Sequence, residues 1–355
     1  MKVLQVSPTY FSKNSCLGGG ERYAMELARQ VSKKVETKFV SFGKKRESFK
    51  LDNLSVEIFP FWFLLNGSLE NPVTPMFFRE IFWADIVHCH QIYTMPTSFA
   101  LMTAKIFGKK FFATHSGSHQ KNLINKMRLW GKIDGFLLLS QFSANLLQSP
   151  KEKTAIIYGG VDTEKFRPAI NPDRGYILCV SRLVPHKGIN YLIEAINNNV
   201  PLKIAGTESD PEYLNYLKQL AQGKNVEFIF NASDEEIVKL YQNALLGVQP
   251  SVYSDYQGKK YQDPELLGLT TLESMACGTP VLVTNVGSLP ELINNKVGFI
   301  VEPSDPAQIR QVIDSVVNNR KGAERMGQAG REHVIQNFTW DKTVNKCLSA
   351  YEGIF

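Results

Sequence analysis

Short apolar runs alternate with longer amphipathic stretches along most of the chain. Residues 2–7 form the first apolar run, and residues 21–34 follow a glycine-rich loop with Ala24, Leu27 and Val31 on one helical face. Runs of the same kind predict further strands at residues 37–41, 85–89, 111–114, 135–139 and 154–157. Short strands separated by helical stretches predict a parallel sheet with helices on both faces.

The same pattern restarts after residues 166–173, a segment with two prolines and no hydrophobic periodicity. Strands are predicted at residues 176–181, 202–205, 226–230, 246–249, 281–284 and 298–301, and helices at 189–197 and 212–222. A length of 355 residues is enough for two domains. We therefore expect two doubly wound, Rossmann-like α/β domains, residues 1–169 and 170–337, and a final helix in 338–355 that crosses back to the first domain. Because ligands of such sheets bind beyond the carboxyl ends of the strands, we expect the chemistry in the loops after strands, in a cleft between the domains.

The composition is that of an ordinary globular protein, with a hydrophobic fraction of 43% and a charged fraction of 21%. No apolar run approaches the length of a membrane-spanning helix, and the first ten residues lack the pattern of a signal peptide. The cysteines are odd in number and scattered, which favours reduced thiols in a cytosolic protein over disulfides or a zinc site. They are Cys16, Cys89, Cys179, Cys277 and Cys347.

Positive charge is concentrated in the first half of the chain. Residues 1–170 carry 23 Lys and Arg against 13 Asp and Glu, whereas the remaining residues carry 17 against 21. A basic half can face nucleic acid, an anionic membrane or an anionic substrate. Nucleic acid is disfavoured because the sequence contains no recognisable nucleic-acid-binding module.

Two glutamates eight residues apart, Glu265 and Glu273, form the strongest local signal. The first is expected in a loop, and the second on a helix that begins near residues 268–270. A carboxylate can hold two vicinal hydroxyls of a sugar or ribose, and the amides at a helix start can hold phosphate. A solvated helix face is the alternative, against which Gly268 and the Cys-Gly-Thr-Pro-Val sequence after the helix argue.

Cations and glycines follow other predicted strands. Arg182 and Lys187 lie between the strand at 176–181 and the next helix, where a guanidinium and an ammonium suit a diphosphate. Two unrelated surface cations are the alternative. The glycines at 18–20 permit close approach of a ligand to the backbone, but their spacing fits neither G-x-G-x-x-G nor a P-loop, and a flexible turn is the alternative.

These motifs together resemble those of a known family. The chain resembles the retaining glycosyltransferases of the GT-B fold, glycosyltransferase family 4 (glycosyl transferases group 1), over nearly its whole length. The resemblance rests on the glycine-rich first loop, the pairs Arg182/Lys187 and Glu265/Glu273, Ala84-Asp85-Ile-Val-His88-Cys-His90, Thr114-His115, Tyr158-Gly-Gly-Val-Asp162, Phe166-Arg-Pro168 and Phe338-Thr-Trp340.

The resemblance implies a role for each matching residue. Arg182 and Lys187 would bind the diphosphate of the donor and stabilise it as the leaving group, while Glu273 would hold the ribose. Glu265 would hold hydroxyls of the transferred sugar, and His115 would reach the sugar near its reacting face. Arg182, Lys187, Glu265 and His115 would thus be catalytic. Further donor contacts are implied for Gly19, Gly20, Gly206, Asn231, Leu267, Gly268, Leu269 and Thr270.

The implied activity is transfer of a hexose, with retention, from a nucleotide diphosphate sugar to a hydroxyl of a glycan or lipid-linked acceptor, in polysaccharide or envelope glycan synthesis. UDP-glucose is the first candidate donor, ahead of other UDP-hexoses and GDP-mannose, and no cofactor is expected. Because no D-x-D occurs in the sequence, we expect the cations to replace a metal ion. The expected location is the cytoplasm, with peripheral contact to an anionic membrane as a further expectation.

Two alternatives stay open: a sugar-nucleotide epimerase of the same fold, and a nucleotide-sugar-binding protein without catalysis. The intact cations and glutamates argue against the second. Two positions depart from the family pattern. Leu266-Leu267 stands where Pro-Phe is common, and Ser116 stands where Asp often follows the histidine, which leaves an acid or base role beside His115 open.

Three further segments admit a structural or a functional interpretation. His88 and His90 share a strand face and could ligate a metal, but a strand-end position lining the cleft is favoured. The aromatic run at 59–65 is expected in the core or in a cleft wall, with lipid contact as the alternative. Residues 121–132 mix cations with apolar residues and predict either an amphipathic helix packed on the sheet or a membrane-surface helix.

Overall fold

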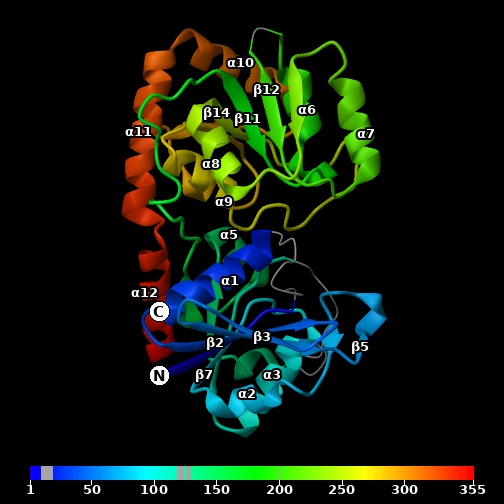
Figure 1. Cartoon of the computed structure of the whole chain (residues 1–355), viewed down its shortest axis with the longest axis vertical. Helices are drawn as coiled ribbons and strands as arrows, with labels where there is room; N and C mark the ends of the chain where they lie inside the picture. The colour runs from blue at the N-terminus through cyan, green and yellow to red at the C-terminus, as the bar shows by residue number, and fades with distance from the viewer. Residues whose placement is uncertain (9–18, 118–123, 125–128, 199) are drawn as a thin grey trace. The chain divides into compact units, whose positions relative to one another are not determined.

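The computed structural model describes residues 1–8, 19–117, 124, 129–198 and 200–355. It divides into two compact units, Met1–Gly160 with Trp340–Phe355, and Val161–Thr339. Each unit is a largely parallel sheet with helices packed on it, which confirms the predicted two-domain α/β class (Figure 1). Residues 161–169, assigned to the first domain from sequence, belong to the second unit, where Arg331 donates hydrogen bonds to the carbonyl oxygens of Thr163 and Phe166.

The first unit contains an eight-stranded sheet of order β10-β9-β8-β7-β1-β2-β4-β3. Only β3 runs antiparallel to its neighbour β4, and all other pairs are parallel. The strands are β1 (Lys2–Val6), β2 (Glu36–Gly43), β3 (Glu47–Leu51), β4 (Leu54–Pro60), β7 (Ile86–Cys89), β8 (Lys110–Ala113), β9 (Gly135–Leu138) and β10 (Thr154–Ile156). A short hairpin, β5 (Phe63–Leu64) and β6 (Pro72–Val73), follows β4.

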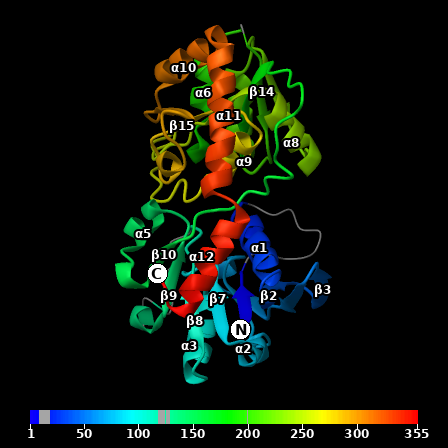
Figure 2. The same cartoon turned by 90° about the vertical axis from the view of Figure 1, so that its left-hand side faces the viewer.

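Helices of the first unit bury apolar faces on this sheet; they are α1 (Gly19–Ser32), α2 (Phe78–Trp83), α3 (Met95–Ile106), α5 (Gln141–Leu147) and α12 (Trp340–Glu352). The C-terminal helix α12 packs against α1, β9 and β10 (Figure 2). Its Trp340 fills the space beside Gly160, where a Cβ atom would lie 2.5 Å from the indole, so that only glycine fits. Tyr23 of α1 packs on the same indole and donates a hydrogen bond to the Tyr158 carbonyl oxygen at 3.0 Å.

The second unit contains a six-stranded, all-parallel sheet of order β13-β12-β11-β14-β15-β16. Its strands are β11 (Tyr176–Val180), β12 (Leu202–Ala205), β13 (Val226–Ile229), β14 (Ala244–Gln249), β15 (Val281–Thr284) and β16 (Gly298–Val301). Its helices are α6 (Ile189–Ala195), α7 (Pro211–Leu220), α8 (Asp234–Asn243), α9 (Leu269–Ala276), α10 (Pro306–Asn318) and α11 (Arg320–Asn337). Near-continuous apolar strands suit a sheet covered on both faces, and the core of this unit includes Ile177, Leu202 and Leu246.

Candidate functional site

The loops after β11 and β14 bring a carboxylate and an ammonium together in the second unit. Glu265 is buried, and its Oε1 accepts hydrogen bonds from Lys187 Nζ, from Gln249 Nε2 at 2.9 Å and from Ser251 Oγ at 3.1 Å. All three donors converge on one oxygen. The second oxygen, Oε2, accepts no hydrogen bond from the residues that the structure describes.

The environment of Glu265 fixes its charge. Burial by itself would raise the pKa of the Glu265 carboxyl, but the Lys187 ammonium and the hydrogen bonds from Lys187 and Gln249 outweigh burial, and the pKa lies below its usual value. Burial, and then the charge of Lys187, lower the pKa of the neighbouring His186 to about 4. At neutral pH the site therefore holds an ionised carboxylate beside a neutral imidazole.

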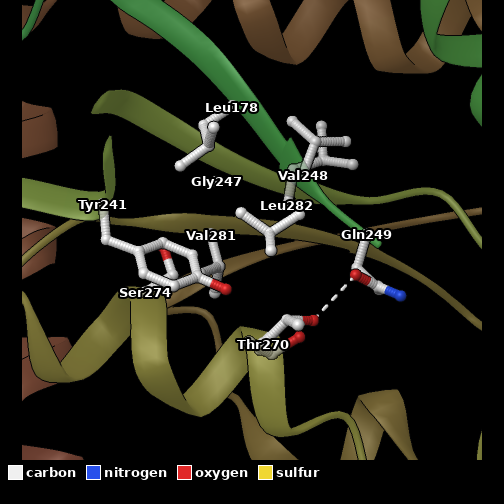
Figure 3. Close-up of a pocket in the computed structure, with 11 residues that line it drawn as sticks. Leu178, Tyr241, Gly247, Val248, Gln249, Thr270, Ser274, Val281 and Leu282 are labelled. Carbon is white, nitrogen blue, oxygen red and sulfur yellow. Dashed lines mark hydrogen bonds between the residues drawn. The ribbon is translucent and has the colours of Figure 1, made fainter. Parts of the chain in front are cut away.

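The start of α9 lies directly after this carboxylate. Gly268 precedes the helix with φ +74°, and a Cβ atom there would lie 2.8 Å from the side chains of Leu289 and Leu292. No side chain among the described residues caps the helix, so backbone amides at its first turn remain for an anion. Thr270 donates a hydrogen bond to Gln249 Oε1 at 3.0 Å (Figure 3). Gln249, which the sequence did not single out, thus connects Glu265 to the helix start.

Glu273 lies further along α9 and accepts a hydrogen bond from the buried Tyr241 hydroxyl at 3.1 Å. Burial, and then the charge of Glu273, hold the pKa of Tyr241 well above its usual value, so the phenol remains a donor. Between α9 and the strands lies a cavity of about 10 Å³, lined by Tyr241, Gly247, Thr270 and Ser274 among others (Figure 3). A cavity of this size holds at most about one water molecule, so it is no nucleotide pocket.

Other predicted donor residues stand at the same carboxyl edge of this sheet. Arg182 follows β11 and is exposed, and Leu267 is buried before α9. Gly206 follows β12, where a Cβ atom would lie 1.8 Å from the Ser181 carbonyl oxygen. Asn231 follows β13 with φ +56°, a left-handed conformation that asparagine tolerates. The fold therefore places residues from four separate loops at the carboxyl edge of this sheet.

A compact turn at residues 253–261 borders this site and was not predicted. Buried Asp255 accepts hydrogen bonds from the Gln257 and Lys259 amides, each at 3.0 Å, and from the Tyr261 hydroxyl at 2.8 Å. The Tyr261 ring lies 5.0 Å from the His186 ring. The only signal in the sequence was the presence of Ser254, Asp255 and Gly258, residue types that are typical of turns.

The candidates in the first unit are Gly19, Gly20 and His115. Gly19 and Gly20 open α1, and a Cβ atom on Gly20 would approach Ser116 to 3.9 Å. His115 follows β8, is fully buried, and packs edge-on against Tyr93 with ring centroids 5.3 Å apart. Cys16, Gly18 and most of the 121–132 segment lie outside the described residues.

His88 is a member of a hydrogen-bonded chain in the core of the first unit. Thr114 Oγ1 donates to the Leu137 carbonyl oxygen, so it accepts from His88 Nε2, and His88 Nδ1 accepts from the Tyr351 hydroxyl at 2.8 Å. Burial keeps the pKa of His88 well below its usual value, as this neutral tautomer requires. The described residues include no group of three side chains suited to a metal ion. Their cysteines are buried and unpaired.

Two family models match the chain. The model for Glycosyltransferase Family 4 matches residues 17–165, and that for Glycosyl transferases group 1 matches residues 160–333. Between them they cover most of both units. The chain belongs to the family 4, group 1 glycosyltransferases. The resemblance inferred from the motifs is confirmed.

Curated relatives of this glycosyltransferase match part of its length. It is 29% identical over 60% of the chain to an uncharacterized glycosyltransferase of Methanocaldococcus jannaschii, of which it covers 57%. It is 25% identical over 57% of the chain to the MMP alpha-(1->4)-mannosyltransferase of Mycolicibacterium hassiacum, of which it covers 48%. The matches thus span about half the length of these relatives.

Solved structures resemble the glycosyltransferase over its whole length. Anabaena HepE, solved in complex with UDP, superposes with a TM-score of 0.77 at 17% identity and full coverage of both chains. A glycosyltransferase from Rickettsia africae superposes with a TM-score of 0.75 at 21% identity, and the match covers 99% of this chain and 97% of the Rickettsia chain. These similarities establish the GT-B fold. No helix of the described residues has the length and apolar character to cross a membrane.

Proposed function

We propose that the protein is a retaining hexosyltransferase that moves a sugar from a nucleotide diphosphate donor to a hydroxyl of a glycan or lipid-linked acceptor, in polysaccharide or envelope glycan synthesis. The observation that supports this most is the buried Glu265 carboxylate, held on one oxygen by Lys187 and Gln249 beside the open start of α9. The other oxygen can accept a hydrogen bond from a sugar hydroxyl.

The proposed reaction depends on stabilising the negative charge that develops on the diphosphate of the donor. As the bond between the sugar and the phosphate breaks, the diphosphate gains negative charge, which Arg182, Lys187 and the amides of α9 stabilise in fixed positions. The departing phosphate oxygen takes the proton of the acceptor hydroxyl as that hydroxyl bonds to the anomeric carbon on the same face, which retains configuration. Glu273, fixed by Tyr241, is proposed to hold the ribose. No step in this scheme requires a metal ion.

The identity of the nucleotide-sugar donor is a separate part of the proposal. HepE structures are described in complex with UDP and with UDP-glucose, which favours UDP-glucose as the first candidate. Curated relatives named as GDP-mannose-dependent mannosyltransferases and as alpha-maltose-1-phosphate synthase show that donors differ among similar proteins. Calorimetry with UDP, GDP and ADP tests which nucleotide base the donor carries. UDP should bind tightest, and tighter binding of GDP or ADP would rule out a UDP-sugar as the donor.

The reaction itself is tested by product analysis. Proton NMR of the product formed from an α-linked donor should show an α-linkage, and a β-linked product would refute retention. Incubation with the donor alone separates the epimerase alternative, because an epimerase would change the sugar configuration without an acceptor. Glu265→Gln should lose transfer, whereas Glu212→Gln, on the exposed face of α7, should keep it.

A further inference from the structure

The β5–β6 hairpin of the first unit exposes large apolar side chains. Trp62 is 67% exposed, Phe63 53% and Leu69 56%. The backbone that carries them is ordered by pairing, because the Trp62 amide donates to the Val73 carbonyl oxygen at 2.9 Å and Asn71 anchors the Met95 amide of α3 at 2.9 Å. The aromatic run was expected in the core or a cleft wall, with lipid contact as the alternative. Phe59 is buried in the core, whereas Trp62 and Phe63 are exposed and lie outside it.

Cations lie beside these side chains. Strands β2 and β4 are parallel neighbours, and the Phe61 amide after β4 donates to the Gly43 carbonyl oxygen at the end of β2. Lys44 and Lys45 follow Gly43 and are exposed. Arg46 is engaged within the protein, since it pairs with Glu57 and covers the Phe59 ring. Exposed indole, phenyl and ammonium groups therefore share the carboxyl edge of the sheet, where open α/β sheets bind ligands.

The opposite edge of the same sheet differs. Lys109, directly before β8, donates to the Phe82 carbonyl oxygen, and Lys110, the first residue of β8, donates to the Tyr351 carbonyl oxygen. The exposed Phe107 packs its ring against Phe82 at 4.4 Å. The pair Lys44 and Lys45 and the pair Lys109 and Lys110 thus lie at opposite edges of the sheet, and the second pair already has hydrogen-bond partners. This edge supplies matched control positions.

We propose that the hairpin surface, defined as Trp62, Phe63 and Leu69 with Lys44 and Lys45, docks on an anionic lipid bilayer. Tryptophan and phenylalanine favour the region of the lipid headgroups, where an apolar ring is buried and the indole N–H finds a partner. Lysines flanking such rings attract anionic headgroups. The lysine ammonium groups favour an anionic membrane over a neutral one. The inference rests on the proposed function, because docking of the hairpin surface would hold the carboxyl edge of the sheet near a lipid-linked acceptor.

The test is sedimentation of the full-length protein with phosphatidylcholine vesicles, with and without phosphatidylglycerol. Wild type should sediment only with the anionic vesicles, and should be released at ~0.5 M salt because exposed charges are then screened. Lys44→Glu with Lys45→Glu should weaken binding by about fivefold or more per cation. Trp62→Ser with Phe63→Ser should weaken it by at least about tenfold. The control positions Lys33, before β2, and Ile106, the last residue of α3, are exposed like the residues that they match. Lys33→Glu with Lys109→Glu, and Ile106→Ser with Phe107→Ser, should bind as wild type does.

Quenching of tryptophan fluorescence by brominated lipids is a second measurement, and it is made first on the wild-type protein, so it does not depend on the folding of a variant. The brominated lipids should quench wild-type tryptophan fluorescence, and Trp62→Phe, which keeps an aromatic ring, should remove the quenching while sedimentation persists. The proposal is overturned if wild type stays in the supernatant at low salt or if the control variants lose binding equally. It is also overturned if Trp62→Ser with Phe63→Ser sediments with the anionic vesicles as wild type does. These assays contain no donor, and nucleotide calorimetry on the same samples reports separately on the proposed function.

Discussion

Replacing Lys187 with methionine separates the role of its charge in folding from its role in catalysis. The side chains of Lys187 and Glu265 are only 13% and 8% exposed, so the substitution leaves a buried carboxylate without its counter-ion. Breaking a buried ion pair costs about 3–5 kcal/mol of unfolding free energy. Because Gln249 and Ser251 still donate hydrogen bonds to Glu265 in the variant, we expect a loss of ~3 kcal/mol, at the lower end of this range. Loss of a fixed charge at a developing anion should lower kcat by about 10²–10³.

The pKa of Glu265 predicts how the free energy of unfolding changes with pH in wild type and in the variant. In wild type the pKa of Glu265 lies below its unfolded value, so its contribution to stability is complete above about pH 4.3 and is lost only as the pH falls through the folded pKa. Without Lys187, burial dominates and raises the pKa of Glu265. The folded variant then binds a proton more readily than the unfolded chain, so its destabilisation should shrink from pH 8 to pH 5.

A double variant completes the test. Lys187→Met with Glu265→Gln removes both buried charges, and its free energy of unfolding should return to within ~1 kcal/mol of wild type, while activity stays low. Lys203→Met, which breaks a half-exposed pair with Glu227 at 3.2 Å on the same sheet, should cost about 1 kcal/mol or less and leave activity unchanged. Urea unfolding at each pH and donor turnover provide the measurements. The reasoning fails if Lys187→Met matches Lys203→Met in stability, or if it keeps more than half of wild-type activity.

Three further predictions concern other parts of the molecule. Gly206→Ala should lower the unfolding temperature clearly, because its Cβ atom would overlap the Ser181 carbonyl oxygen, whereas Gly131→Ala, with open space around it, should not; thermal unfolding decides between them. Stability should fall below pH 6.5 by up to about 1.4 kcal/mol per pH unit for each of His88 and His90, because burial depresses the pKa of both and only the unfolded chain takes up protons. Urea midpoints that are equal at pH 7 and 5.5 would contradict this. Transfer should persist in excess EDTA, and a loss that manganese or magnesium restores would show a metal requirement.

Local pattern was enough to predict much of the fold. Strands β12, β15 and β16 have the predicted bounds, because buried parallel strands appear in sequence as continuous apolar runs between turns. The antiparallel strand β3 was missed, since alternate residues face solvent and its run is short and polar. Its partner β4 was missed although Leu54, Val56 and Ile58 alternate as in a half-buried strand. Helices α10 and α11 were not predicted, and the second of them contains three glycines that weaken a helical signal.

The sequence by itself determined which residue types reach the carboxyl edges of the sheets, because a residue after a strand is placed there by chain order alone. It did not determine which side chains meet. Lys187 and Glu265 are 78 residues apart, and Tyr241 and Glu273 are 32 apart, so their contacts depend on strand order and on how α8 and α9 pack. Burial also depends on the tertiary structure. Neighbouring aromatic residues look alike in sequence, yet Phe59 of β4 is buried in the core, whereas Trp62, three positions later and directly before β5, is exposed to solvent.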